Sequence, residues 1–384
     1  MQLRKIIKKG FADLFIIWSR EIKYVYKDIG VVIFFIVVPL IYPIIYGFIY
    51  NPETIREVSL VVVEESHSSI AREFIRKINA SPDVNVYVYA ANMDEAKKIV
   101  DRKEAYGILQ IPSEFSRKLH RGEQSEVILY LDMSGLLFYK AILLATTEAS
   151  LQMGKEINVN AEDMPIQYEA ISMYNTQNGF ASFLVPGILM LVIQQTLLLG
   201  VGMLAATSRE KNRGKLIPPG STHEGASRIV FGKALAYFTI YIFVCIWALA
   251  VVPRIFNLIQ IARPGNLLLF ALPYLSACIF LTMAISTFVR GRETPMMIFV
   301  FTSLPLLFLS GISWPASAIP DFWRYFSYLF PSTFGIQGFV KLNSMGATLH
   351  NVAWEYRMLW LQAGIYFLVT SAIYMYNVHR DKGR

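Results

Sequence analysis

Six long apolar blocks constrain this chain more than any other feature of its sequence. Charged residues are nearly absent from these blocks, which cover residues 29–50, 180–206, 229–252, 267–289, 295–312 and 356–378. An α-helix rises about 1.5 Å per residue, so about 20 apolar residues are needed to cross the hydrocarbon core of a bilayer. The blocks therefore predict a polytopic α-helical membrane protein with six transmembrane helices, of which the fifth is close to the short limit.

The charges between these blocks predict how the chain is oriented. Residues 51–179 hold 13 basic and 19 acidic side chains, a net charge of −6, whereas the net charge of the whole chain is +8. Most basic residues outside that region flank the apolar blocks, chiefly in residues 1–28 and 207–233. By the positive-inside rule, both termini and the loop 207–228 are cytoplasmic, and residues 51–179 lie outside. This pattern favours a membrane partner over nucleic acid.

The N-terminal 28 residues predict an amphipathic helix. Its apolar side chains recur at steps of three and four residues, at Leu3, Ile7, Phe11, Leu14, Trp18, Ile22 and Val25. Lysines and arginines occupy the other faces. Such a helix suits the inner-leaflet interface, because its apolar face enters the lipid and its cations face the headgroups. The alternative is a helix that packs on other protein.

Residues 51–179 predict an α/β extracytoplasmic domain inserted after the first span. Runs of strand length and composition lie at 58–63, 84–89, 106–111 and 127–131, and helical segments separate them. Residues 66–69, Ser-His-Ser-Ser, offer N-cap positions for the first of these helices. A long helix over about 136–157 carries Lys140, Glu148 and Lys155, so we expect a connecting helix here and not a seventh span.

The segment 313–345, between the last two blocks, is aromatic but interrupted by prolines. Its candidate outer-gate residues are Trp314, Pro315, Pro320 and Pro331. We expect it to lie at the outer interface or to re-enter the membrane, since irregular backbone at that depth must be buried in protein or line water. Residues 379–384 form a short cytoplasmic tail.

The chain lacks the sequence motifs of common enzymes. None of its Gly-Lys pairs is followed by Ser or Thr, so there is no P-loop and no ATP hydrolysis is expected from this polypeptide. His223-Glu224 is followed at the third position by Ser227, which rules out a zinc-protease motif and leaves no metal site. Cys245 and Cys278 both fall in predicted spans, as small core residues.

Three stretches together resemble one family of transporters. They are FLVPGILM at the second block, SREKNRGK after it, and FLSGISWPASAIPDFWRYFSYLFPSTFGIQGF between the fifth and sixth blocks. With the strand and helix order of the outer domain, they resemble the permease subunits of type-2 ABC exporters, in particular the bacterial multidrug-efflux branch with a large outer domain. Two positions depart from that pattern, Thr176 where the family often has proline, and Lys215 where it often has threonine.

The resemblance implies partners and a division of labour. A separate ABC ATPase subunit would bind ATP and Mg²⁺, and this chain would bind no cofactor. A second permease, identical or different, would complete the pore within membrane lipid of the bacterial inner membrane. A periplasmic adaptor and an outer-membrane channel accompany this branch in Gram-negative hosts.

The resemblance also assigns residues to the coupling with the ATPase. The loop after the second span is the main candidate, and the turn before the fifth span is the second. Their residues are Arg209, Glu210, Lys211, Arg213, Gly214, Arg290, Arg292 and Glu293. The positive-inside rule alone accounts for the cations in these loops but not for Glu210 among them.

The candidate substrate pathway rests on polar and kink-forming residues inside the spans, namely Pro39, Tyr42, Pro43, Tyr46, Gln194 and Gln195. The alternative for each is helix packing or an interhelical hydrogen bond. Because the spans present no paired acids, a hydrophobic cargo such as a drug is favoured over an ion. A lipid or lipid-linked product is a second candidate cargo. A membrane-anchored sensor or scaffold is the alternative of another class.

Overall fold

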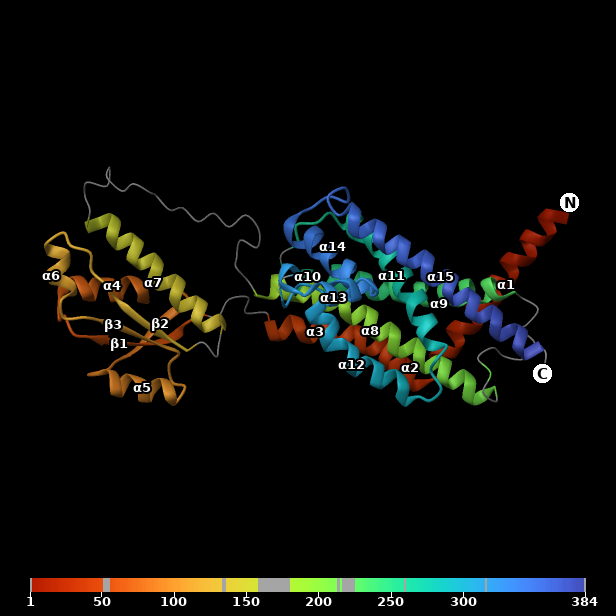
Figure 1. Ribbon diagram of the computed structural model, residues 1–384, viewed down its shortest axis with the longest axis horizontal. Helices are drawn as coiled ribbons and strands as arrows, with labels where there is room; N and C mark the ends of the chain where they lie inside the picture. Colours follow the sequence, from red (N-terminus) through yellow and green to blue (C-terminus); the bar gives the residue numbers. More distant parts are fainter. Residues whose placement is uncertain are drawn as a thin grey trace. The chain divides into compact units, whose positions relative to one another are not determined.

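The computed structural model describes residues 2–50, 56–132, 136–157, 180–212, 215, 225–258, 260–314 and 316–382. The chain forms two compact units (Figure 1), one of residues 1–51 with 172–384 and the other of residues 52–171. In its described residues the first unit is helical, and the second combines a sheet with helices. The fold is thus that of a largely helical polytopic membrane protein with a small inserted sheet.

The helical unit begins with α1, Gln2–Lys27, and a broken helix after Asp28. That broken helix consists of α2 Ile29–Val32, the π-helical turn η1 Ile33–Val37 and α3 Val38–Tyr50. The remaining helices are α8 Phe180–Lys211, α9 Ala226–Ile246, η4 Trp247–Val251, α10 Val252–Ile255, α11 Pro264–Ser286, α12 Glu293–Leu309, η5 Ala316–Ala318, α13 Asp321–Ser327, α14 Pro331–Met345 and α15 Ala353–Lys382.

Five helical runs among the described residues are long and apolar enough to cross a membrane: Ile29–Tyr50, Leu184–Lys211, Ala226–Ile255, Pro264–Ser286 and Ala353–His379. The fifth predicted span, at 295–312, corresponds to α12, whose 17 residues end at Leu309. A helix of that length rises about 25 Å, which is at the lower limit for a span.

Helix α8 is the centre of the unit. In its apolar window 94% of the residues are buried, compared with 22% in the first span. Its sequence is apolar on every side, which is typical of a helix surrounded by other helices. It contacts α3, α11, α12 and α14. The helix does not stop at residue 206, where the apolar block ends, but continues to Lys211.

Glycines allow the spans to approach α8 closely. A Cβ built on Gly200 would lie 2.0 Å from a ring atom of Phe35 in η1. At Gly187 the nearest atom is 1.9 Å away, on Ile312. Small residues at such crossings let helix backbones pack closely. In a membrane this close packing holds helices together, because lipid is as apolar as the side chains and supplies no hydrophobic driving force for their association.

The predicted outer segment is mostly helical. Pro320 and Pro331 mark the beginnings of α13 and α14, because proline is tolerated at the start of a helix. Helix α14 is largely buried and packs against α8, α11 and α15, whereas α13 exposes Phe322, Trp323 and Tyr325. The segment therefore contributes a buried helix to the core, which its aromatic composition did not indicate.

The N-terminal helix has a protein partner. The predicted helix forms, but its buried side is centred on Ile17, Glu21 and Val25, and it packs against α9. Ile17 lies against Gly232, where a Cβ would be 2.8 Å from Ile17 Cγ2. Helix α9 therefore covers part of this face, in agreement with the alternative of packing on other protein, and the placement at the inner-leaflet interface stays a prediction.

The second unit follows the predicted order of strands and helices. The elements are β1 Val58–Glu64, α4 Ser69–Asn79, β2 Val84–Tyr89, α5 Met93–Asp101, β3 Gly107–Ile111, α6 Phe115–His120, β4 Ile128–Leu131 and α7 Leu136–Ile157. The sheet order is β2-β1-β3-β4, with β1 parallel to both β2 and β3, and β4 antiparallel to β3.

Helices cover both faces of this sheet. Leu60 and Val62 of β1 pack under α4 and α7, and Val61 and Val63 pack against α5 on the opposite face. Burial on both faces explains why β1 is apolar without alternation from Leu60 to Val63. The long helix α7 is part of this core through residues such as Ile142 and Met153, consistent with its not being a span.

Candidate functional site

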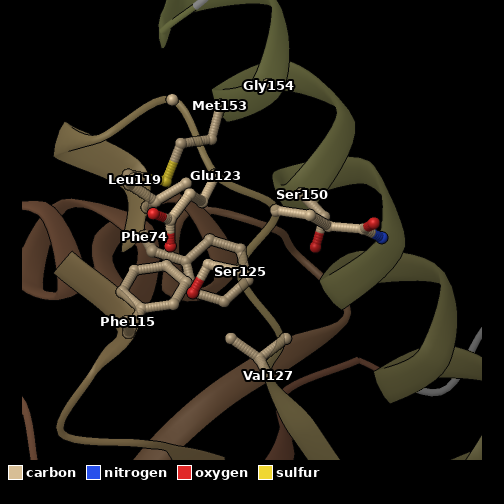
Figure 2. A pocket seen from close by; sticks show the side chains of 11 residues that line it. Phe74, Phe115, Leu119, Glu123, Ser125, Val127, Ser150, Met153 and Gly154 are labelled. Atoms are coloured by element: carbon tan, nitrogen blue, oxygen red, sulfur yellow. The ribbon is translucent and has the colours of Figure 1, made fainter. Parts of the chain in front are cut away.

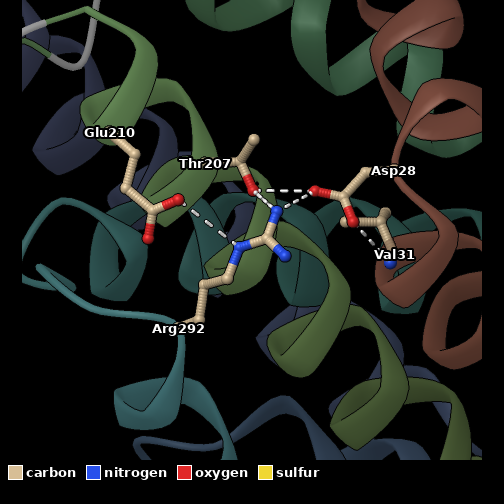
Figure 3. Close-up of polar contacts among 5 residues, drawn as sticks. All are labelled: Asp28, Val31, Thr207, Glu210 and Arg292. Carbon is tan, nitrogen blue, oxygen red and sulfur yellow. Dashed lines mark hydrogen bonds and ion pairs between the residues drawn. The ribbon is translucent and has the colours of Figure 1, made fainter.

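Four side chains from three segments of the chain meet in one cluster of the helical unit (Figure 3). We call Asp28, Thr207, Glu210 and Arg292 the Asp28–Arg292 cluster. Asp28 lies between α1 and α2, and Thr207 and Glu210 lie one turn apart near the end of α8. Arg292 is the N-cap residue of α12. The cluster thus joins the start of two candidate spans to the end of the central helix.

Each contact within the cluster involves a charged group, and Arg292 takes part in all but one of them. The Arg292 guanidinium donates through Nη2 to Asp28 Oδ2 and, at 2.6 Å, to Thr207 Oγ1. Thr207 Oγ1 donates in turn to Asp28 Oδ2 at 2.8 Å. Arg292 Nε lies 3.6 Å from Glu210 Oε2. One guanidinium therefore holds the two acids, a geometry that lysine cannot reproduce.

Asp28 also fixes the backbone where the first span begins. Its Oδ1 accepts a hydrogen bond from the Val31 N–H at 3.4 Å, as an N-cap side chain does. The two carboxylate oxygens of Asp28 therefore have separate roles. Oδ1 caps the N-terminus of α2, and Oδ2 accepts hydrogen bonds from Arg292 and Thr207.

The cluster runs from the buried interior to the surface. Asp28 and Thr207 are 9% and 7% exposed, whereas the side chain of Glu210 is 54% exposed. The Asp28–Arg292 pair is consequently the stronger contact, because a buried carboxylate that loses its partner is left without solvation. The Glu210–Arg292 pair is screened by water and is worth about 0–1 kcal/mol.

Arg209 makes a second link from α8. Its guanidinium donates to the carbonyl of Thr287, the residue that caps the C-terminus of α11. A cation at this end of a helix satisfies a carbonyl that lacks an intrahelical partner and interacts favourably with the helix dipole. The end of α8 is thus bonded to both sides of the turn between α11 and α12.

The other predicted coupling residues lie near this cluster or outside the described structure. Lys211, Arg290 and Glu293 are exposed on the surface. Arg213 and Gly214 lie outside the described residues. The structure thus brings together Arg292 and Glu210 of the predicted set, and it adds Asp28, Thr207 and Thr287, which the sequence interpretation had missed.

Polar contacts also hold α1 on α9. Glu21, which is 4% exposed, accepts a hydrogen bond from the Tyr237 hydroxyl and lies 3.2 Å from Lys233 Nζ. Closer to the N-terminus, Asp13 pairs with Arg228 at 3.1 Å. Because Arg228 and Lys233 lie in the first turns of α9, these pairs link the N-terminal helix to the end of the predicted coupling loop 207–228.

The predicted pathway glutamines make interhelical hydrogen bonds. Gln194 Nε2 donates to Ser332 Oγ at 3.2 Å, and its Oε1 accepts from the Ser332 N–H at 2.7 Å. Gln195 Nε2 donates to Thr302 Oγ1 at 3.1 Å. These bonds tie α8 to α14 and α12, as polar side chains do between membrane helices.

The remaining pathway and gate residues lie in the first span and in the segment after α12. Pro39 and Pro43 are buried in the first span, directly after the π-helical turn η1. Tyr42, Tyr46 and Tyr50 form a ladder of neighbouring rings on α3. Trp314 is exposed, and its Nε1 donates to the Ala318 carbonyl at 3.4 Å. Pro315 lies outside the described residues.

A groove of about 420 Å³ lies among α9, α11 and α15. Its walls are almost wholly apolar and include Phe231, Phe280, Trp360 and Phe367. The Phe367 ring contacts the rings of Phe231 and Phe280 edge to face, at centroid distances of 6.5 Å and 5.2 Å. Gly364 leaves the groove open, since a Cβ there would meet nothing within 4 Å.

A comparison with protein-family models gives one match. The model of the ABC-2 family transporter proteins matches residues 29–372. This match begins at the first span, includes the inserted α/β unit and ends within α15. No curated protein matches the chain.

Proposed function

The chain belongs to the ABC-2 family of transporter proteins, a family of multi-pass membrane permeases that implies an ABC ATPase partner, and we propose that it exports hydrophobic or amphipathic small molecules. ATP and Mg²⁺ would be bound by the ATPase, because this chain has no P-loop. The chain itself would supply the membrane path. A second permease, identical or homologous, would form the other half of that path.

The Asp28–Arg292 cluster is the observation that carries this proposal. An ATPase that docks beneath the membrane can do work only if a contact passes its movement to the spans. The cluster bonds the last turn of α8 to the starts of the first span and α12. A push on residues 212–225 would therefore move three spans together and not only the helix ends that it touches.

The orientation follows from charge. Both termini and residues 212–225 would be cytoplasmic, since lysines and arginines gather there, and the acidic inserted unit would be extracytoplasmic. An even number of spans is needed to place both termini on one side. We therefore count α12 as a span, the fifth of six along the chain, at the lower limit of length.

The composition of the spans supports an apolar cargo. The groove among α9, α11 and α15 offers aromatic walls, and the buried glutamines of α8 are already hydrogen-bonded. The same groove would equally accept an acyl chain, and this keeps a lipid or a lipid-linked product as the second candidate cargo. A sensor that moves nothing has less support, because one or two spans would serve it.

The proposal is tested by reconstitution with the ATPase partner. The chain alone should hydrolyse no ATP, and its complex with a P-loop protein should hydrolyse ATP at a rate that responds to the permease. Reversing the charge of Glu210 in Glu210→Arg should reduce this stimulation several-fold, because the variant repels Arg292. Arg324→Ala on α13, outside the cluster, is the matched control and should behave as wild type. Failure of any P-loop protein to co-purify, or equal activity in both variants, would refute the proposal.

A further inference from the structure

The inserted α/β unit contains a pocket that export does not explain. It has a volume of about 440 Å³ and lies between α6, residues 122–127 and α7 (Figure 2). Phe74 of α4 and Phe115 of α6 form its apolar wall, with ring centroids 6.1 Å apart, and Met153 of α7 closes one side. A pocket of this size that is mostly apolar but has a few polar groups is the usual form of a small-molecule site.

Two glycines keep the pocket open. Gly122 adopts φ +72°, the left-handed region that favours glycine, and turns the chain after α6. Gly154 faces the pocket from α7. A Cβ built at either position would meet nothing within 4 Å, so neither position is closed off by a neighbouring side chain.

The polar groups of the pocket define the charge of a ligand. Among the side chains that line it, Glu123 is ionisable, and no lysine or arginine is present. Within the described residues no ion pair involves the Glu123 carboxylate, whereas the nearby Arg117 and Lys118 both pair with Glu114. The local charge is therefore an unneutralised carboxylate beside an aromatic wall.

A buried hydroxyl in the same pocket also lacks a partner. Ser125 Oγ is shielded from solvent, and no hydrogen-bond partner for it occurs in the part of the chain that the structure describes. Ser150, across the pocket, donates to the Thr146 carbonyl at 2.8 Å and is satisfied. A buried polar group without a partner is unfavourable, and a bound molecule is one way to satisfy it.

We propose that this pocket binds an amphipathic organic cation. The aromatic and aliphatic wall would bind the apolar body of the ligand. Phenylalanine rings also attract a neighbouring cation through their faces, so the same wall would favour a positive group. The Glu123 carboxylate would hold the positive group, and Ser125 would bond a polar atom of the ligand. An anion of the same shape would meet Glu123 with like charge and be rejected. This site belongs to the inserted unit alone and stands independently of export.

The experiment uses a matched pair of ions and a matched pair of cysteines in the full chain in lipid nanodiscs. Tetraphenylphosphonium and tetraphenylborate have the same shape and opposite charge. Ser150→Cys places a thiol in the pocket, and Thr147→Cys places one on the same helix outside it. Both parent residues are exposed hydroxyls bonded to a carbonyl four residues earlier. The native cysteines are buried, so their background labelling is measured in the parent chain.

We expect tetraphenylphosphonium to slow maleimide labelling of Ser150→Cys at least fivefold and to leave Thr147→Cys unchanged. Tetraphenylborate should protect neither thiol. Added to Ser150→Cys, Glu123→Gln should weaken protection about tenfold, whereas Glu126→Gln, at an exposed residue outside the pocket, should not. Gly154→Trp should fill the space and abolish protection.

Three results would overturn the proposal. They are absence of protection, equal protection by the two ions, and protection that survives Glu123→Gln. If Gly154→Trp fails to fold, Glu123→Gln still decides the question, since it changes a surface carboxylate and leaves the packing intact. Loss of ATPase stimulation has no bearing on this outcome, so the site and the exporter function can fail separately.

Discussion

Arg292 is the residue that connects the other members of the Asp28–Arg292 cluster. Its guanidinium bonds Asp28 and Thr207 and pairs with Glu210, so one side chain connects groups that lie 264 and 85 positions away in the sequence. Lysine would preserve the charge but would offer one point of contact in place of a planar fork. The arginine therefore connects these groups through the geometry of its guanidinium. Substitution of Asp28, Thr207 or Glu210 should weaken the contacts between the spans that Arg292 connects.

Single residues show where sequence reasoning succeeds and where it stops. Glu210 and Arg292 were predicted from local signals, a lone acid among cations and a charged turn between apolar blocks, and the structure places them 3.6 Å apart, while their coupling role stays a prediction. Asp28 was missed, although it begins an apolar helix as N-caps do, because its second partner lies on another helix. Pairings between distant segments depend on the tertiary fold, which periodicity and composition do not specify.

Gly200 should tolerate no side chain. A Cβ at this position would lie 2.0 Å from the Phe35 ring, so Gly200→Ala must displace η1 from α8 and should cost about 1–3 kcal/mol. Gly364→Ala is the matched control, since a Cβ there meets open space. The measurement is the thermal denaturation midpoint of each purified variant. The first should fall by several degrees and the second should remain at the wild-type value; equal midpoints would show that α8 and η1 do not pack as described.

At the scale of elements, periodicity and composition predicted most of what forms. The four strands and three short helices of the inserted unit lie where their patterns placed them, because each has a strong local signal in alternation, turn residues or caps. The ends of elements were less accurate: α8 extends to Lys211 beyond its apolar block, since a helix can continue in charged residues once it is outside lipid. Which helix covers α1 was not predictable, because an amphipathic face fits lipid and protein alike.

The start of α5 offers a test of element stability. Asn92 accepts a hydrogen bond from the Glu95 N–H at 2.9 Å, and Glu95 Oε2 accepts from the Ala91 N–H at 2.8 Å. Asn92 is thus the N-cap of α5, and the Glu95 carboxylate bonds the N–H of the residue before it, so Asn92→Ala should remove about 1 kcal/mol. Hydrogen exchange of the full chain should become faster in the first turn of α5 and remain unchanged in α4, which Ser68 caps separately. Unchanged exchange in α5 would contradict the assigned cap.

At the scale of the whole molecule, the regions richest in cations also make many of the charged contacts between helices. Cations gather in residues 1–28 and 207–233, and these regions supply the pairs between α1 and α9 and three of the four residues of the Asp28–Arg292 cluster, all but Arg292. Family membership implies an ABC ATPase partner, which we propose as the source of the energy. The identity of the cargo was not predictable from the sequence, because apolar walls select by size and shape and carry no residue-specific motif.

The central claim is that the Asp28–Arg292 cluster transmits the work of the ATPase to the spans. Its most direct test is the coupling ratio, measured as molecules of an amphipathic dye transported per ATP hydrolysed in proteoliposomes that contain the permease and its ATPase. Arg292→Ala should leave the complex assembled, reduce the stimulation of hydrolysis as Glu210→Arg does, and lower this ratio at least tenfold, whereas Arg324→Ala should leave both unchanged. A wild-type ratio in Arg292→Ala would contradict the account.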